Sequence, residues 1–218
     1  MDYFLQQLIN GLSLGSLYAL IAVGYTVVYG IVQLINFAHG EIFMIGAFGS
    51  YATWMLLGHP TDWSTPMTLL VLLPVMLIGG IVASVTVALL TERFAYRPLR
   101  NAPRLAPLIS AIGVSVFLQE VVRLFFGTIP GFPDAKRGIP FPAIRGISGE
   151  SIQLGGVTIQ MPAVFTLVAL GVCTVFLWFF VNRTKTGRAM VATSQDPDTA
   201  RLMGINVDRV IMAAFAVG

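Results

Sequence analysis

Long apolar runs recur along this chain and are separated by short polar segments. A helix needs about 20 mostly apolar residues to cross a bilayer, and five windows reach or approach that length. They are Leu8–Val32, Ile42–Leu57, Met67–Leu90, Pro107–Phe126 and Pro162–Val181. Charged residues make up 11% of the chain, against roughly 25% in soluble domains, so there is too little polar surface to cover a water-exposed globule. We therefore predict an all-α integral membrane protein, a bundle of about five to six transmembrane helices.

A sixth apolar stretch begins near Val207, and the sequence reaches Gly218 before this stretch is long enough to cross a bilayer. We therefore expect residues 1–218 to form a single transmembrane domain that is incomplete at its C-terminus. The second of the five windows is short, so its assignment as a span depends on the charges of the connecting segments.

Basic residues gather in two of these connecting segments, which together hold nine of the thirteen Lys and Arg. They are Arg93, Arg97, Arg100 and Arg104 in the first segment and Arg183, Lys185, Arg188, Arg201 and Arg209 in the second. If all five windows cross the bilayer, the two segments lie on the same side, and the positive-inside rule makes that side the cytoplasm. The chain is then a multi-pass protein of the inner (plasma) membrane with its N-terminus outside.

The outer connection 127–161 is predicted to be a periplasmic loop. Within it, Ser151–Gln160 alternates around the pair Gly155-Gly156, which is typical of a β-hairpin. Such a loop could dock a binding protein or cover the mouth of a pathway, and an ordered connecting loop is the alternative.

The inner connection 182–206 carries a short helical pattern. Asp196 and Asp198 stand where acidic side chains favour a helix N-terminus, and Gly204 stands where a helix can end. The pattern predicts a short amphipathic helix between two spans, of a kind that can insert into a groove on a partner protein. On this pattern alone, a plain solvated loop is the alternative.

Polar side chains between and within the first two windows are candidates for lining a translocation path. They are Tyr25, Asn36, His39 and Glu41. Gly30 and Gly40 weaken helix continuity around them, and non-helical backbone at membrane depth survives only where protein or water covers it. An ordinary cytoplasmic turn explains the same polar residues, and helix packing explains the tyrosine.

One carboxylate, Glu120, lies well inside a span, with Arg123 three residues further on. An intramembrane charge is costly, and an (i, i+3) ion pair reduces that cost. We therefore predict a structural ion pair, and proton-relay chemistry is the alternative.

Signatures of soluble enzymes are missing from the sequence. There is no GxxxxGK[ST] phosphate-binding loop, no HExxH, no convincing nucleophile–base arrangement, and Cys173 is the single cysteine. The basic residues form no nucleic-acid stripe. We predict a protein that is not an enzyme, with no cofactor, no metal and no nucleic-acid partner.

Two motifs in the same order resemble the branched-chain amino acid ABC transporter permease family. Asp198-Thr199-Ala200, followed by three residues and Gly204, is similar to the EAA-x3-G coupling loop of ABC importer permeases, with Thr199 in place of the first alanine. The stretch Gly30–Glu41 resembles an early motif of the branched-chain amino acid permeases. The similarity extends from Leu8 to Gly218, and family members normally continue for further spans.

The resemblance implies a permease subunit that moves branched-chain amino acids and is driven by ATP hydrolysis elsewhere. The implied partners are two ABC ATPase subunits, a second permease subunit, a periplasmic substrate-binding protein and the lipid bilayer. Its coupling helix would be formed by Asp198, Thr199, Ala200, Arg201 and Gly204.

Three alternatives to this function remain open at the level of the sequence. Related permeases for urea or short amides look similar. An ion-coupled secondary carrier would use Glu120 and Glu41 as coupling sites. A membrane scaffold without transport is the third.

Overall fold

The computed structural model describes residues 2–33, 35–61, 63–100, 102–103, 105–129, 132–133, 135, 139, 141, 143–144, 146–148, 150–154 and 156–218. Helices dominate the described part of the chain. They are α1 (Asp2–Val32), α2 (His39–Leu56), α3 (Thr65–Met67), η1 (Thr68–Leu72), α4 (Leu73–Thr91), η2 (Glu92–Tyr96), η3 (Arg97–Leu99), α5 (Leu105–Phe125), η4 (Phe126–Thr128), α6 (Met161–Arg183), α7 (Lys185–Gln195), α8 (Pro197–Leu202) and α9 (Val207–Val217). Two short strands, β1 (Ser151–Leu154) and β2 (Val157–Gln160), complete the description.

Four helical stretches in the described part of the chain are long and apolar enough to cross a membrane. They are Tyr3–Val32, Thr65–Leu99, Leu105–Thr128 and Met161–Arg183. The prediction of an all-α, multi-pass integral membrane protein is confirmed. The short second window corresponds to α2, an 18-residue helix that packs along α4.

Small residues set the contact between α2 and α4. A Cβ added to Gly80 would lie 2.8 Å from the carbonyl oxygen of Gly46, and one added to Gly49 would lie 2.5 Å from the Cβ of Ala83. Atoms do not approach that closely, so larger side chains would push the helices apart. This is the close backbone packing that holds helices together in lipid.

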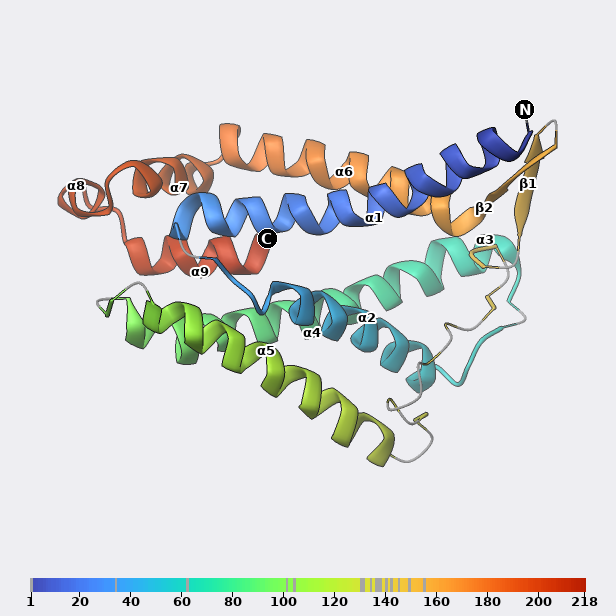
Figure 1. Cartoon of the computed structure of the whole chain (residues 1–218), viewed down its shortest axis with the longest axis horizontal. Coiled ribbons are helices and arrows are strands. Elements are labelled where there is room, and N and C mark those ends of the chain that lie inside the picture. The colour runs from blue at the N-terminus through green and yellow to red at the C-terminus, as the bar shows by residue number, and fades with distance from the viewer. Residues whose placement is uncertain are drawn as a thin grey trace.

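The helices form two layers, with α1, α6 and α9 in one and α2, α4 and α5 in the other (Figure 1). Helix α9 joins the layers, because it packs against both α1 and α4. The buried cluster at this junction includes Val28 of α1, Tyr96 of η2, Ala111 of α5 and Phe215 of α9. The rings of Tyr96 and Phe215 have their centroids 5.2 Å apart.

The bundle has two distinct ends (Figure 1). The N-terminus, α3 and the two strands lie at one end, called here the hairpin end, and α7 and α8 lie at the other, called the α8 end. At the hairpin end, β1 and β2 pair antiparallel in the segment where the sequence predicts a β-hairpin, with Ser151 opposite Gln160. Gly155 lies outside the described residues. The side-chain amide of Gln6 accepts from the N–H of Thr158 and donates to its carbonyl, which ties β2 to α1.

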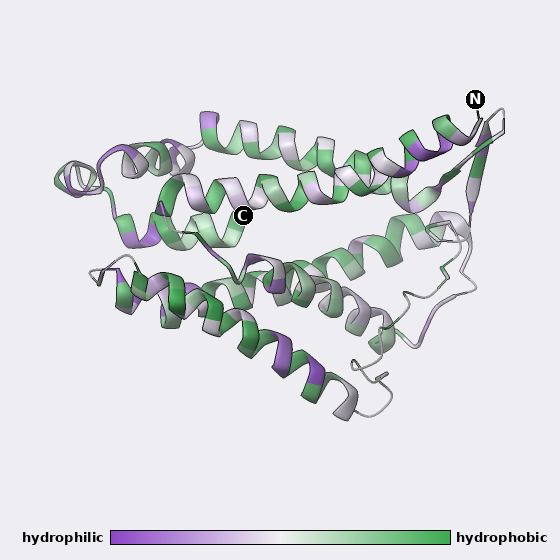
Figure 2. Ribbon diagram, in the orientation of Figure 1, coloured by the Kyte–Doolittle hydropathy of each residue, from purple (hydrophilic) through white to green (hydrophobic). Residues whose placement is uncertain are grey.

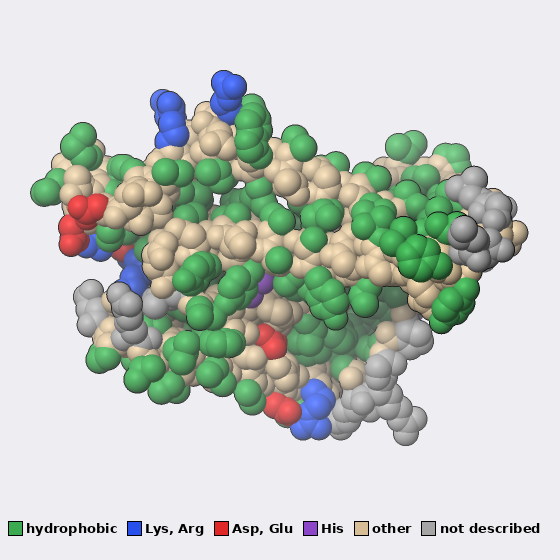
Figure 3. All heavy atoms as spheres, turned by 45° about the horizontal axis from the view of Figure 1, so that its top comes forward, with side chains coloured by type: hydrophobic (Ala, Val, Ile, Leu, Met, Phe, Trp, Pro, Cys, Tyr) green, Lys and Arg blue, Asp and Glu red, His purple; other side chains and the backbone are tan. Residues whose placement is uncertain are grey.

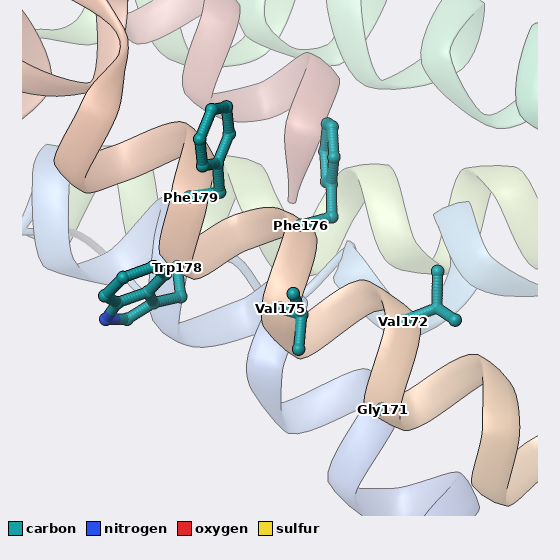
Figure 4. Close-up of a pocket in the computed structure, with 6 residues that line it drawn as sticks. All are labelled: Gly171, Val172, Val175, Phe176, Trp178 and Phe179. Carbon is teal, nitrogen blue, oxygen red and sulfur yellow. The ribbon is translucent and has the colours of Figure 1, made fainter.

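Hydrophobic residues dominate the long helices, and hydrophilic residues concentrate near the ends of the bundle (Figure 2). Many of the apolar side chains on these helices are exposed. The space-filling view shows one face, on which hydrophobic side chains are spread along the whole length of the bundle (Figure 3). On α6, five exposed side chains and Gly171 line a shallow apolar pocket; the five are Val172, Val175, Phe176, Trp178 and Phe179 (Figure 4). In water this surface would drive aggregation, whereas a lipid bilayer covers it at no cost.

Candidate functional site

Helix α8 is short, and both of its ends are capped. The Oδ1 of Asp196 accepts from the N–H groups of Asp198 at 2.9 Å and Thr199 at 3.1 Å, so Asp196 is the N-cap. The hydroxyl of Thr199 also donates to Asp196, and this bond, followed by the two backbone bonds, holds the pKa of Asp196 below its ordinary value. The prediction of a short helix that begins after Asp196 is confirmed.

The other end of α8 is a glycine-dependent turn. Gly204 has φ +84°, and its N–H donates to the carbonyl of Arg201, while the N–H of Ile205 donates to the carbonyl of Ala200, both at 3.0 Å. These two bonds define a Schellman motif, in which the left-handed residue is usually glycine. Because Ala200 is buried and Ile205 packs against the same cluster, the turn fixes α8 on the bundle.

The free side of α8 points away from the bundle. Leu202 is 87% exposed and Met203 78% exposed, which is unusual for apolar side chains at the polar end of a membrane protein. Arg201 and Asp198 form an exposed ion pair at 2.9 Å on the same helix. The five residues that the sequence singled out here therefore form one element, with Ala200 facing inward and the others outward or at the turn.

A cluster of ion pairs joins α9 to η2 and η3, which continue the chain after α4. Asp208, in the first turn of α9, accepts from Arg97 at 2.8 Å and from Arg100. Arg100 also pairs with Glu92, whose side chain is completely buried. Burial alone would raise the pKa of Asp208, but the two guanidinium groups outweigh burial and lower it.

This ion cluster places the two basic connecting segments together at the α8 end. Arg97 and Arg100 come from the segment before α5, and Asp208 lies beside Arg209 in the segment after α6. The expectation that the two segments share one side of the bundle is thus confirmed, and Arg104 lies outside the described residues. Lys and Arg side chains are visible towards this end in Figure 3.

Sequence reasoning missed Glu92, because it assigned that residue to a connecting loop. The structure continues the helix beyond Thr91 as the π-helical turn η2, which carries Glu92 into the interior. The apolar residues Phe94, Ala95 and Tyr96, which follow Arg93 directly, were the available signal that the apolar helix goes on.

The structure has a break between helices α1 and α2, in the region where the sequence indicates weakened helix continuity. Helix α1 ends at Val32, Gln33 takes a positive φ of 56°, and α2 begins at His39. The side chain of Asn36 holds this connection, since its Oδ1 accepts from the N–H of Ala38 at 3.1 Å and from the hydroxyl of Tyr96 at 3.0 Å.

The four candidate path residues lie around this break but do not converge. His39 turns towards α1, where its ring meets that of Tyr25 edge-on with centroids 5.6 Å apart. Glu41 turns towards α5 instead, and its Oε1 accepts from the Nε2 of Gln119 at 2.6 Å. A single site made of all four residues is therefore excluded in this conformation. The structure adds Tyr96 and Gln119, which the sequence had not singled out as parts of this region.

Glu120 and Arg123 form the predicted (i, i+3) ion pair, with a shortest distance of 2.6 Å. Both side chains are about half exposed, at 47% and 51%, on the outer surface of α5. Within the described residues, no group of three or more His, Cys, Asp or Glu side chains could hold a metal ion.

The fold and the site together define a class: a polytopic helical membrane protein with a capped, protruding helix at its basic end. The family described as the permease component of the branched-chain amino acid transport system matches residues 7–218, and the chain belongs to that family. Its similarity therefore covers both the broken α1–α2 region and α8.

Several curated relatives match nearly the whole chain. The permease protein LivH of the high-affinity branched-chain amino acid transport system is 41% identical over 222 residues in both Salmonella typhimurium and Escherichia coli K12. The corresponding BraD of Pseudomonas aeruginosa is 40% identical over 222 residues. In each case the match covers 99% of this chain and 67% of the relative. No solved structure matches the chain significantly.

Proposed function

We propose that this protein is the membrane-spanning permease subunit of an ATP-driven ABC importer for branched-chain amino acids. The observation that carries the proposal is α8, a capped helix whose apolar tip, Leu202 and Met203, stands free at the basic end of the bundle. A protruding helix with an apolar tip suits a groove on a partner protein. The names of the relatives support the substrate class.

The orientation follows from the charges. Because the basic segments share the α8 end, the positive-inside rule puts that end in the cytoplasm of the inner membrane. The hairpin end and residues 127–161 then face the periplasm, where a substrate-binding protein would dock. Residues 182–206 form the coupling loop, which meets one of two ABC ATPase subunits, and a second permease subunit completes the passage.

Coupling in this proposal is mechanical. The ATPase dimer pushes on α8 as it closes. Because Ala200 is buried and the Gly204 turn is held by two hydrogen bonds, α8 and α9 move together. Asp208 then pulls on Arg97 and Arg100, and through η3 and η2 on α4. Both layers of the bundle move, since α9 packs against α1 as well as α4.

The decisive experiment is leucine uptake by the full-length protein reconstituted with its partner subunits and binding protein. Uptake should require ATP and should survive a protonophore when the ATP concentration is held constant. Collapse on uncoupling alone would identify an ion-coupled carrier. Uptake of urea or acetamide in place of leucine would shift the substrate class to short amides.

A further inference from the structure

We propose that the start of α2 is a binding site for the headgroup of an α-amino acid. In this site, N–H groups of the helix start and the amide of Asn36 hold the carboxylate, and Glu41 holds the ammonium. The proposal rests on the proposed function, because it assigns a site to the substrate of that transport.

The position of the helix start is the first argument. Residues 33 and 35–38 are non-helical, and in Figure 1 the chain runs here from the α8 end back along the bundle, so that α2 begins between the two ends. Irregular backbone at membrane depth is tolerated only where it is buried in protein or lines a cavity. In transporters, the N-terminus of a helix that starts inside the membrane often points at an anionic group of the substrate.

Unused hydrogen-bond donors are the second argument. Asn36 is only 3% exposed, and its Nδ2 is buried without a partner in the described part of the chain, although its Oδ1 is used twice. The N–H groups of Gly40 and Glu41 likewise have no acceptor among the described residues. Donors at a helix start also gain from the positive end of the helix dipole. Three donors at one helix start are suited to a carboxylate.

An unbalanced carboxylate is the third argument. The Oε1 of Glu41 accepts from Gln119, but its Oε2 is buried and has no partner among the described residues. None of the ion pairs among the described residues includes Glu41. A charge in such a place is expensive unless it is neutralised. The ammonium of an amino acid would supply the missing positive charge.

The surroundings match the rest of such a ligand. Glu41 contacts Gln119 of α5, and Asn36, just before α2, contacts Tyr96 of η2, which itself packs against α5. Next to Glu41 in the chain, Ile42 belongs to a buried apolar cluster that joins α2 to α5 through Leu118. An aliphatic side chain would fit beside this cluster, whereas His39 faces α1 and takes no part.

The test is direct binding of leucine to the full-length protein, purified in lipid nanodiscs with its partner subunits but without the binding protein. The competitors are 4-methylpentanoate, which lacks the ammonium, and 3-methylbutylamine, which lacks the carboxylate. The wild type should prefer leucine to both. Glu41→Gln should weaken leucine binding about tenfold or more and remove the preference for leucine over 4-methylpentanoate, because one charge-assisted bond is lost.

Two control variants separate this site from a general effect on folding. Glu41→Asp keeps the charge and should keep the preference for leucine. Glu120→Gln removes a carboxylate that is already paired on the surface of α5, and it should leave leucine binding unchanged. An unchanged preference in Glu41→Gln, or no leucine binding to a wild type that transports leucine, would overturn the site alone. A wild type that does not transport leucine at all would overturn the proposed function.

Discussion

Replacing Arg100 with leucine tests how much the buried Arg100–Glu92 ion pair stabilises the protein, compared with the exposed Arg97–Asp208 pair. Without Arg100, the carboxylate of Glu92 loses the cation that balances it, and Glu92 has no exposed surface through which water could compensate. Breaking a buried ion pair by removing one partner costs about 3–5 kcal/mol of unfolding free energy. Arg97 and Asp208, by contrast, are 43% and 42% exposed, so Arg97→Leu should cost about 1 kcal/mol or less.

Unfolding by sodium dodecyl sulfate in mixed micelles, followed by the fluorescence of the three tryptophans, measures both values. The double variant Glu92→Leu/Arg100→Leu provides the matched control, because it leaves no unpaired buried charge and should recover most of the loss. Equal costs for Arg97→Leu and Arg100→Leu, or a double variant as unstable as Arg100→Leu alone, would refute the reasoning.

Three further predictions concern single residues. Gly204→Val places a β-branched residue at φ +84° and should abolish uptake while the protein stays in the membrane. Gly204→Asn should retain most uptake, because asparagine tolerates that conformation. Normal uptake in Gly204→Val would argue against the coupling turn. The lowered pKa of Asp196 means that its cap is fully formed above the ordinary carboxyl value of 3.8 and is lost as the pH falls through the lower folded value. The protection factors of the α8 amides, which are their exchange rates corrected for the intrinsic rate at each pH, should therefore stay constant from about pH 7 to about pH 4 and fall only below that. A fall in protection near pH 6 would contradict the capping role. Glu120→Gln should lower the melting temperature of the protein without changing its substrate profile, and an altered profile at normal expression would contradict the structural ion pair.

Local features of this fold could be predicted from the sequence because their causes are local. The apolar length of each span is set by the thickness of the bilayer, and α8 is set by a cap at Asp196 and a left-handed turn at Gly204. The Glu120–Arg123 pair needs only three residues of helical spacing.

Features that join distant parts of the chain could not be predicted in this way. Arg100 and Asp208 are 108 residues apart, and nothing in either segment specifies the other as its partner. The burial of Glu92 depends on the π-helical turn that continues α4. The sequence pattern assigns this stretch to a connecting loop and so does not predict the turn. The separation of His39 from Glu41 follows from helical geometry, since residues two apart point to different faces, but only once α2 is known to begin at His39.

The side of the membrane on which α8 lies is the most direct test of the whole account. In a background where Cys173, the single native cysteine, is replaced by serine, Leu202→Cys and Ile152→Cys place one exposed thiol at each end of the bundle. A membrane-impermeant maleimide added to intact cells should label Ile152→Cys at once and Leu202→Cys only after the membrane is permeabilised. Labelling of Leu202→Cys in intact cells would put α8 outside, where no ATPase could reach it, and would contradict the account.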